Sequence, residues 1–174
     1  MLHNRYSRIG IIGDLEEAIQ ITQEAVRATP KGHPNRLSHL NNLGGKLSDK
    51  YLSTGAICDL DEAIRLTQEA VGATPNDHPN RALWLNNLGT RLNDRYLRTG
   101  SIRYLEDAVR VFQEAAAATP KHSPNYASVL HNLGARLGDR YLRIGAISDL
   151  EEAIQTIREA IKITPKDHRD MLYS

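Results

Sequence analysis

The sequence predicts an all-α protein in which antiparallel helix pairs stack into an α-solenoid. The main observation is an internal repeat, because Thr-Pro, Leu-Gly and an Asp-Leu or Tyr-Leu pair each recur every 45 residues. Residues 14–58 and 59–103 are identical at 29 of 45 aligned positions. In addition, only 5% of the residues are aromatic. The core must therefore consist of Leu, Ile, Val and Ala, which favours closely packed helices over a β-sandwich.

The 174 residues are predicted to form a single array. Residues 1–13 match the end of one type of helix, residues 14–58, 59–103 and 104–148 are full units, and residues 149–174 contain a last helix and the start of another unit. One helix pair cannot bury its apolar face alone, so stacking of neighbours supplies the core. Neither end has a polar capping face. We therefore expect a fragment of a longer array that forms homo-oligomers through its terminal stacking faces.

Each repeat is predicted to contain a first-type helix followed by a second-type helix. The second type begins at an Asp-Leu pair: Asp59 is expected to cap the helix while Glu62 returns a bond to the backbone. Apolar residues follow at helical spacing over residues 60–71, and Pro75 ends the helix. In the other repeats the cap position holds Asp14, Asp149 and Tyr104, of which the tyrosine predicts a less sharp start.

The first-type helix begins just after His78-Pro79, because proline is tolerated in a first turn. It extends for about 20 residues and stops at Gly100, which can adopt the left-handed conformation that closes many helices. The equivalent glycines are Gly10, Gly55 and Gly145.

Glycine also recurs inside the first-type helices, at Gly44, Gly89 and Gly134. An interior glycine costs about 1 kcal/mol relative to alanine, so another helix is expected to pass very close there. The small residues Ala18, Ala63, Ala108 and Ala153 of the second-type helices are the predicted partners.

These motifs resemble those of the tetratricopeptide repeat family. The family pattern is matched in one stretch by Leu85, Leu88, Gly89, Leu92, Ala108, Phe112, Ala115 and Pro120. The period is longer than the usual one, and with His78-Pro79 and the Leu-Asn-Asn-Leu run at residues 85–88 the chain is similar to kinesin light chain repeats and to long fungal arrays. The resemblance implies a right-handed superhelix that acts as a protein-binding scaffold, with the first-type helices lining a concave groove.

Each first-type helix carries a polar pair in its middle. The pairs are Asn41-Asn42, Asn86-Asn87 and His131-Asn132. A side-chain amide both donates and accepts hydrogen bonds, so it can bind the backbone of an extended peptide. The resemblance implies this role above all for Asn42, Asn87 and Asn132. Alternatively, the amides bond neighbouring helices and hold the register of the repeats. Specificity would come from variable positions, namely Ser38, Leu83 and Ser128, and Gly45, Thr90 and Ala135.

A basic stripe follows the first-type helices at i, i+4 and i+7 spacing. The candidate partner-binding residues are Arg91, Arg95, Arg136 and Arg140, accompanied by Lys46, Lys50, Arg98, Arg143, Arg5 and Arg8. The stripe could bind an acidic peptide or a phosphate-bearing partner. Alternatively, the arginines pair with carboxylates such as Asp94 and Asp139 of neighbouring turns and helices, as most helical charge runs do.

Several classes of function are disfavoured. The 22 Lys and Arg balance 21 Asp and Glu, which argues against a nucleic-acid-binding protein, although RNA binding along the stripe is a weaker alternative. No apolar run is long enough to span a membrane, and we expect a cytoplasmic protein. We find no metal-ligand cluster, phosphate-binding loop or nucleophile elbow, so we expect neither enzyme activity nor a cofactor. We expect His33, His78 and His168 to lie in equivalent loops, Cys58 to be inert and Trp84 to be packed.

Overall fold

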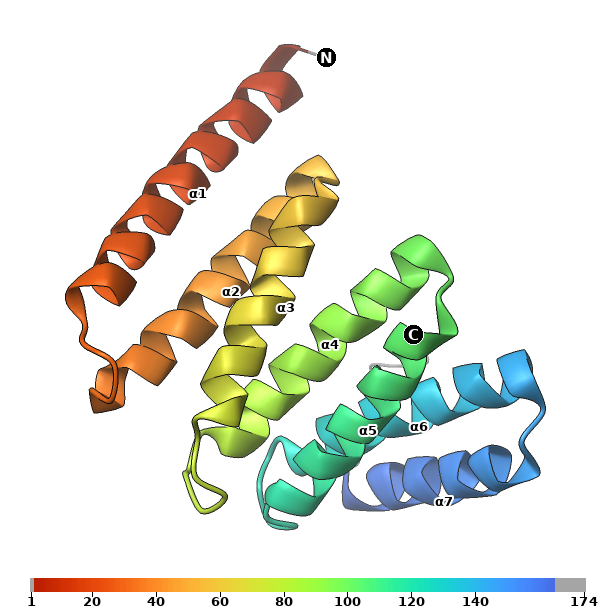
Figure 1. Cartoon of the computed structure of the whole chain (residues 1–174). Helices are drawn as coiled ribbons and strands as arrows, with labels where there is room; N and C mark the ends of the chain where they lie inside the picture. The colour runs from red at the N-terminus through yellow and green to blue at the C-terminus, as the bar shows by residue number, and fades with distance from the viewer. Residues whose placement is uncertain (1, 165–174) are drawn as a thin grey trace. The chain divides into compact units, whose positions relative to one another are not determined.

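The computed structural model describes residues 2–164 of the chain, and the side chains of residues 13–164. This part consists of α-helices without strands, so the predicted all-α helical repeat of the solenoid class is confirmed (Figure 1). The helices are α1 (Leu2–Ala28), α2 (Pro34–Thr54), α3 (Ile57–Gly72), α4 (Arg81–Thr99), α5 (Ile102–Ala118), α6 (Tyr126–Ile144) and α7 (Ile147–Ile163). The predicted start of a further unit, which includes His168, lies outside the described residues. So do the side chains of Arg5 and Arg8.

The chain divides into two compact units, Met1–His78 and Pro79–Ser174. In the first unit, α1 packs against α2 and α2 against α3. In the second unit, α4 packs against α5, α5 against α6, and α6 against α7. The division falls inside the repeat 59–103, between its two helices. The superhelix implied by the resemblance stays a prediction.

The first-type helices α2, α4 and α6 end as predicted. Gly55, Gly100 and Gly145 have φ values of 73°, 66° and 73°, in the left-handed region. The N–H of each glycine donates to a tyrosine carbonyl four residues earlier, at 2.7 Å. Because the chain reverses at the glycine, only one further residue separates it from the next helix.

The fourth glycine of this series, Gly10, does not end a helix, so that prediction is wrong. Helix α1 continues from Leu2 to Ala28, and Asp14 therefore lies inside a helix instead of capping one. Residues 2–9 would form an isolated helix of about two turns, which is too short to be stable. Continuation through Gly10 keeps the backbone hydrogen bonds of both segments within one helix.

The predicted caps of the second-type helices are also wrong. Helix α3 has Ala56 as its N-cap, and Asp59 is its third residue. Helix α5 begins at the equivalent position, so Tyr104 does not alter its start. The left-handed glycine and the single residue after it fix where the next helix begins, and the aspartate lies two residues inside that helix. Asp59 is still favourable in the first turn, because its charge complements the helix dipole.

Close helix approach at the interior glycines is confirmed in the second unit, but the contacting residues differ from those predicted. A Cβ on Gly89 would lie 2.8 Å from the ring of Phe112, and one on Gly134 would lie 2.6 Å from the side chain of Ile157. The predicted partner Ala153 contributes only its backbone oxygen, at 3.4 Å. The glycine therefore makes room for a large side chain one turn beyond the expected alanine. Around these contacts lies a core of Leu85, Leu88, Leu92, Leu105, Val109, Leu130, Leu133 and Leu137.

Candidate functional site

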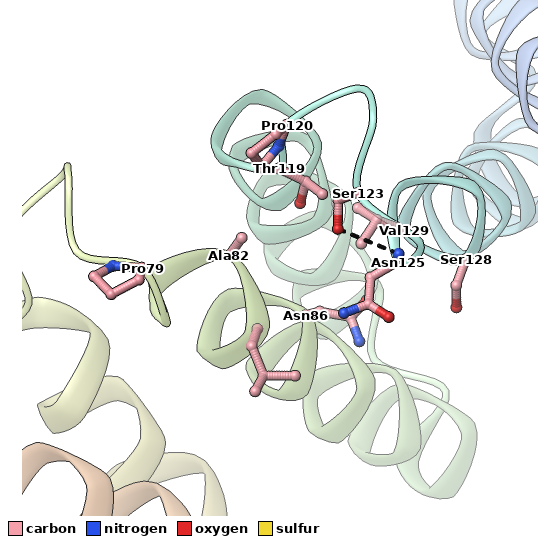
Figure 2. Close-up of a pocket in the computed structure, with 10 residues that line it drawn as sticks. Pro79, Ala82, Asn86, Thr119, Pro120, Ser123, Asn125, Ser128 and Val129 are labelled. Carbon is pink, nitrogen blue, oxygen red and sulfur yellow. Dashed lines mark hydrogen bonds between the residues drawn. The ribbon is translucent and has the colours of Figure 1, made fainter.

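A pocket of about 190 Å³ lies between the first-type helices of the second unit, α4 and α6. Three structural elements line it, as Figure 2 shows. Pro79 before α4 and Ala82, Leu83 and Asn86 of α4 form one wall. The connection after α5 contributes Thr119, Pro120, Ser123 and Asn125, and α6 contributes Ser128 and Val129.

The chemistry of this pocket is mixed. Leu83 is 49% exposed although it is a large apolar residue, and Asn86 lies one turn further along the same face of α4. Ser128, at the position equivalent to Leu83 in the next repeat, is exposed on the opposite wall. The pocket therefore offers an apolar contact beside an amide and a hydroxyl, which suits a peptide side chain and the backbone attached to it.

One asparagine pair in this site holds two helices together. Asn132 Nδ2 on α6 donates to Asn86 Oδ1 on α4 at 3.1 Å, and the pair is partly buried. The bond joins the second amide of one helix to the first amide of the other, as the alternative interpretation of these residues predicted. It engages only the acceptor of Asn86, and the amide N–H groups of this residue remain at the wall of the pocket.

The other residues of the predicted polar pairs differ in how exposed they are to solvent. Asn41 is buried and Asn42 is exposed in the first unit. In the second unit Asn87 is half-buried and His131 is exposed. The polar pairs therefore do not form a row of equally exposed amides. Their role in ligand binding stays a prediction.

The predicted basic residues of the second unit are largely engaged within the chain. Arg140 makes two hydrogen bonds of 2.7 Å to the carboxylate of Asp149 on α7. The guanidinium carbon of Arg95 lies 5.4 Å from the ring centroid of Tyr104, a cation–π contact. Arg136 pairs with Asp139 at 3.1 Å, in agreement with the interpretation of the stripe as paired charges.

Arg91, the remaining predicted arginine, is 5% exposed and lies near Asp94. Burial raises the pKa of Asp94, and the charges of Arg91 and Arg136 oppose this effect. These contacts engage the four predicted arginines within the chain, and their role in partner binding stays a prediction.

Sequence reasoning missed two of the arginine partners. Asp149 and Tyr104 were interpreted only as occupants of a cap position. A signal was present, because Arg140 precedes Asp149 by nine residues and Arg95 precedes Tyr104 by the same distance. The connection prolines Pro79 and Pro120 were likewise read only as helix boundaries, yet they line the pocket.

The pocket recurs at equivalent places in other repeats. In the first unit a cavity of about 330 Å³ is lined by Pro34, Leu37, Pro75 and His78 among others, each 45 residues before Pro79, Ala82, Pro120 and Ser123. In the second unit a neighbouring cavity of about 520 Å³ contains Pro124, Ala127 and Thr164, each 45 residues after Pro79, Ala82 and Thr119. Ser123 and Ser128 line both cavities of the second unit.

Other kinds of site were sought in the same part of the chain. Among the described residues there is no cluster of His, Cys, Asp and Glu that could hold a metal ion. None of the described helices is long and apolar enough to cross a membrane. Cys58 is exposed at the start of α3 and Trp84 is buried in α4. His33 caps α2 by accepting a hydrogen bond from the N–H of Asn35 at 3.2 Å.

Comparison with known proteins agrees with this fold. The sequence model of the family described as "Tetratricopeptide repeat" matches residues 81–120 and 127–170, and residues 14–58 are close copies of the adjoining repeat. The chain belongs to the tetratricopeptide repeat family. Proteins of this family are generally non-enzymatic scaffolds for protein–protein interaction.

Two solved structures of a Podosopora anserina kinesin light chain with nearly identical TPR-like repeats are similar to this chain. One matches with a TM-score of 0.62 and 19% identity, covering 94% of this chain and 74% of that chain. The other, a variant of the same protein, also matches with a TM-score of 0.62 and 19% identity, covering 91% of this chain and 70% of that chain. At this identity the likeness shows the fold alone. No curated protein matches the sequence.

Proposed function

We propose that this chain binds an extended segment of a partner protein in the groove between α4 and α6. The observation that carries the proposal is the pocket that combines half-exposed Leu83 with the amide of Asn86 and the hydroxyl of Ser128. An apolar ligand side chain would cover Leu83, and the amide N–H of Asn86 would donate to a backbone carbonyl of the ligand. A short partner helix is an alternative ligand of the same groove.

Recurrence of the pocket supports this proposal. A repeated protein presents the same wall at each step, so a ligand that follows the array meets a similar pocket in each repeat. The two cavities of the second unit share Ser123 and Ser128. The two cavities therefore adjoin, and one ligand can contact both along this shared wall.

The test is a selection of peptides from a random phage-displayed library against this chain and, in parallel, against its Leu83→Asp variant. Peptides enriched on the parent protein should bind the variant about tenfold more weakly, because a buried leucine contact of about 1.5 kcal/mol is lost. Leu97→Asp is the matched control, since Leu97 lies on the same helix, is exposed and lies outside the pocket. If the selected peptides bind Leu83→Asp as tightly as Leu97→Asp, the proposed site is wrong.

Self-association is the second candidate function, and a separate observation favours it. Helix α7 exposes large apolar side chains, among them Ile147, Ile154 and Ile161, which are 59%, 43% and 50% exposed. Exposed apolar stripes of this kind are typical of interaction surfaces. Sedimentation equilibrium over a concentration series tests the proposal, and a constant monomer mass would contradict it.

A further inference from the structure

We propose that Ser123 is a phosphorylation site and that its phosphoryl group changes which ligands bind in the groove between α4 and α6. Ser123 precedes Pro124, and a serine followed by proline is the acceptor of proline-directed protein kinases. This Ser-Pro dipeptide occurs once in the sequence. The part of the inference that concerns ligands rests on the proposed function, whereas the modification itself does not.

Four Thr-Pro pairs offer the same kind of acceptor, but the structure engages each of their hydroxyls. Each threonine hydroxyl donates to the backbone carbonyl four residues earlier, at 2.5–2.8 Å. In two of the pairs the threonine is also buried, since Thr74 and Thr119 are 5% and 6% exposed. Thr119 lies in the same connection as Ser123, four residues before it. It therefore provides an internal comparison in which the dipeptide is present and the acceptor is hidden.

Ser123 differs from these threonines in both respects. It is partly exposed, and Pro124 after it is exposed. Its Oγ accepts a hydrogen bond from the N–H of Asn125 at 3.3 Å. Among the described residues none accepts a hydrogen bond from the Ser123 hydroxyl, so its proton is available for transfer to a base.

The position of Ser123 is accessible in other repeats as well. His33-Pro34 and His78-Pro79 are the equivalent dipeptides, and His78 is partly exposed while the other three residues are exposed. A further helix pair follows both of these repeats along the chain, so accessibility is a property of the repeat. His33 accepts a hydrogen bond from the N–H of Asn35, as Ser123 does from Asn125. The serine thus keeps the local bond of the histidine and adds a hydroxyl.

A kinase binds its substrate as an extended segment, so it must open two turns around Ser123. The N–H of Ser123 donates to the carbonyl of Pro120 at 2.8 Å, and its carbonyl accepts from the N–H of Tyr126 at 3.0 Å. Both bonds lie in a connection, where local opening costs less than in a packed helix. Pro124 also favours extended backbone at the residue before it. At Thr119 the kinase would in addition have to expose a buried side chain at the end of α5.

The transfer forms one bond and breaks one. Ser123 Oγ attacks the γ-phosphorus of a nucleoside triphosphate, the bond from this phosphorus to the bridging oxygen breaks, and the nucleoside diphosphate leaves. The hydroxyl proton passes to a carboxylate of the kinase. The product has a charge of about −1.5 to −2 at pH 7 and three strong acceptor oxygens.

The surroundings of Ser123 suit this negative charge. Helix α6 begins at Tyr126 without a side-chain cap, and the N-terminal end of a helix stabilises a nearby phosphate. Lys121 and His122 are exposed in the same connection, and residues 119–125 include no carboxylate. Glu159 of α7 pairs with Lys121 at 3.5 Å, so the phosphoryl group would compete with Glu159 for the lysine.

The phosphoryl group also changes the wall of the groove. Ser123 lines the same cavity as Leu83 and Asn86, and no residue that lines this cavity is charged (Figure 2). A phosphate in this wall favours ligands with Lys or Arg and repels acidic ones, since charge-assisted hydrogen bonds are about twice as strong as neutral ones. Phosphorylation would therefore exchange one set of ligands for another.

The first experiment treats the folded chain with ATP and a mitogen-activated protein kinase, which requires proline after the acceptor. Mass spectrometry should locate the phosphate on Ser123, with at least tenfold slower reaction at Thr119. Ser123→Ala and Pro124→Ala should each abolish the reaction at position 123. A chain that remains unmodified at Ser123, or equal rates at Ser123 and Thr119, would overturn the proposed site.

The second experiment tests the place of the phosphate by ³¹P nuclear magnetic resonance over a pH series. The second pKa of phosphoserine is about 6. It should be lower in the folded chain than in the same phosphorylated chain unfolded in urea, because the N-terminus of α6 and Lys121 stabilise the dianion. An equal or higher pKa in the folded chain would overturn this placement.

The third experiment repeats the peptide selection with the phosphorylated chain and, as its control, with Ser123→Ala treated with the same kinase. Peptides enriched only on the phosphorylated chain should contain Lys or Arg and should bind the unmodified chain about tenfold more weakly. The same peptides on both proteins, with Leu83→Asp still weakening them, would overturn the effect on ligands and leave the proposed function standing. If Leu83→Asp weakens none of them, the proposed function is wrong, whereas phosphorylation of Ser123 is measured without any ligand.

Discussion

The ion pair between Arg140 and Asp149 offers a test of how burial determines the strength of a salt bridge. Its two hydrogen bonds measure 2.7 Å, and the side chains are 22% and 7% exposed. Arg65 and Glu62 on α3 have the same bidentate geometry, also at 2.7 Å for both bonds, but their side chains are 58% and 45% exposed. The two pairs therefore match in hydrogen-bond geometry and differ in burial.

We predict that Asp149→Asn lowers the free energy of unfolding by about 2 kcal/mol. A hydrogen bond to a charged group contributes about 1.5–3 kcal/mol, and a fully buried pair loses 3–5 kcal/mol when one partner is removed. The partial exposure of Arg140 and the remaining amide oxygen of asparagine place the value near the lower end. Glu62→Gln should cost less than about 0.5–1 kcal/mol, because Arg65 is exposed to water and keeps its contact with Glu69 at 3.3 Å.

The pH dependence follows from the direction of the pKa shift. The hydrogen bonds from Arg140 lower the pKa of Asp149 below its ordinary value, while burial opposes this. A lowered pKa stabilises the folded state fully above the ordinary aspartate pKa of about 3.9, and this stabilisation is lost as the pH falls through the shifted value. The stability difference between the parent chain and Asp149→Asn should therefore be largest at pH 7 and decrease below about pH 4.

Urea unfolding followed by circular dichroism, at pH 7 and at pH 3, measures this difference. Amide hydrogen exchange of α7 adds a local readout, because helical repeat arrays need not unfold in one step. Two results would refute the reasoning. One is an equal loss of stability in Asp149→Asn and Glu62→Gln at pH 7. The other is a loss in Asp149→Asn that is unchanged at pH 3.

Three further substitutions test the packing and the turns. Gly89→Ala should lower the free energy of unfolding by up to about 2 kcal/mol, because the new Cβ would lie 2.8 Å from the rigid ring of Phe112 and the gain in helix propensity offsets only about 1 kcal/mol. Gly134→Ala should cost less, since the flexible Ile157 side chain that the new Cβ meets can change rotamer. Thermal unfolding of both variants compares the two losses of stability, and a larger loss for Gly134→Ala than for Gly89→Ala would contradict the prediction. Gly100→Ala should cost about 1–2 kcal/mol in urea unfolding, because its φ of 66° is unfavourable for alanine although the surrounding space is open.

The sequence was sufficient to predict the helical repeat and the ends of its first-type helices. The 45-residue spacing indicates the repeat, and a glycine such as Gly100 marks a chain reversal because few other residues adopt its backbone conformation. Helix starts were harder to predict. Asp59 has the composition of a cap, but the turn after Gly55 determines the start of α3, and this turn geometry depends on two helices that pack together. The same composition at Asp14 occurs inside a helix, since no reversal takes place at Gly10.

The candidate site was only partly predictable. Asn86, Leu83 and Ser128 were expected to be functional because of their place on the first-type helices, and they line one pocket. The sequence did not reveal that the side chain of Asn132 donates a hydrogen bond to the side chain of Asn86. A spacing of 45 residues aligns Asn132 with Asn87, whereas the bonded residue is one position away. The crossing of α4 and α6 decides which amides meet, and one sequence does not fix that crossing.

A comparison of equivalent positions in the repeats distinguishes residues that hold the scaffold together from residues that can vary to change ligand specificity. Where a side chain lies in the scaffold, it keeps a partner within the chain: Arg140 pairs with the carboxylate of Asp149, and the equivalent Arg95 stacks on the ring of Tyr104, which occupies the position of Asp149 in its repeat. Leu83 and Ser128 are also equivalent, but both are exposed. Exchange of one for the other changes the wall of the groove without disturbing a core contact. The groove can therefore change its specificity at little cost in stability, and we expect a Leu83→Ser variant to keep its fold while selecting different peptides from the library.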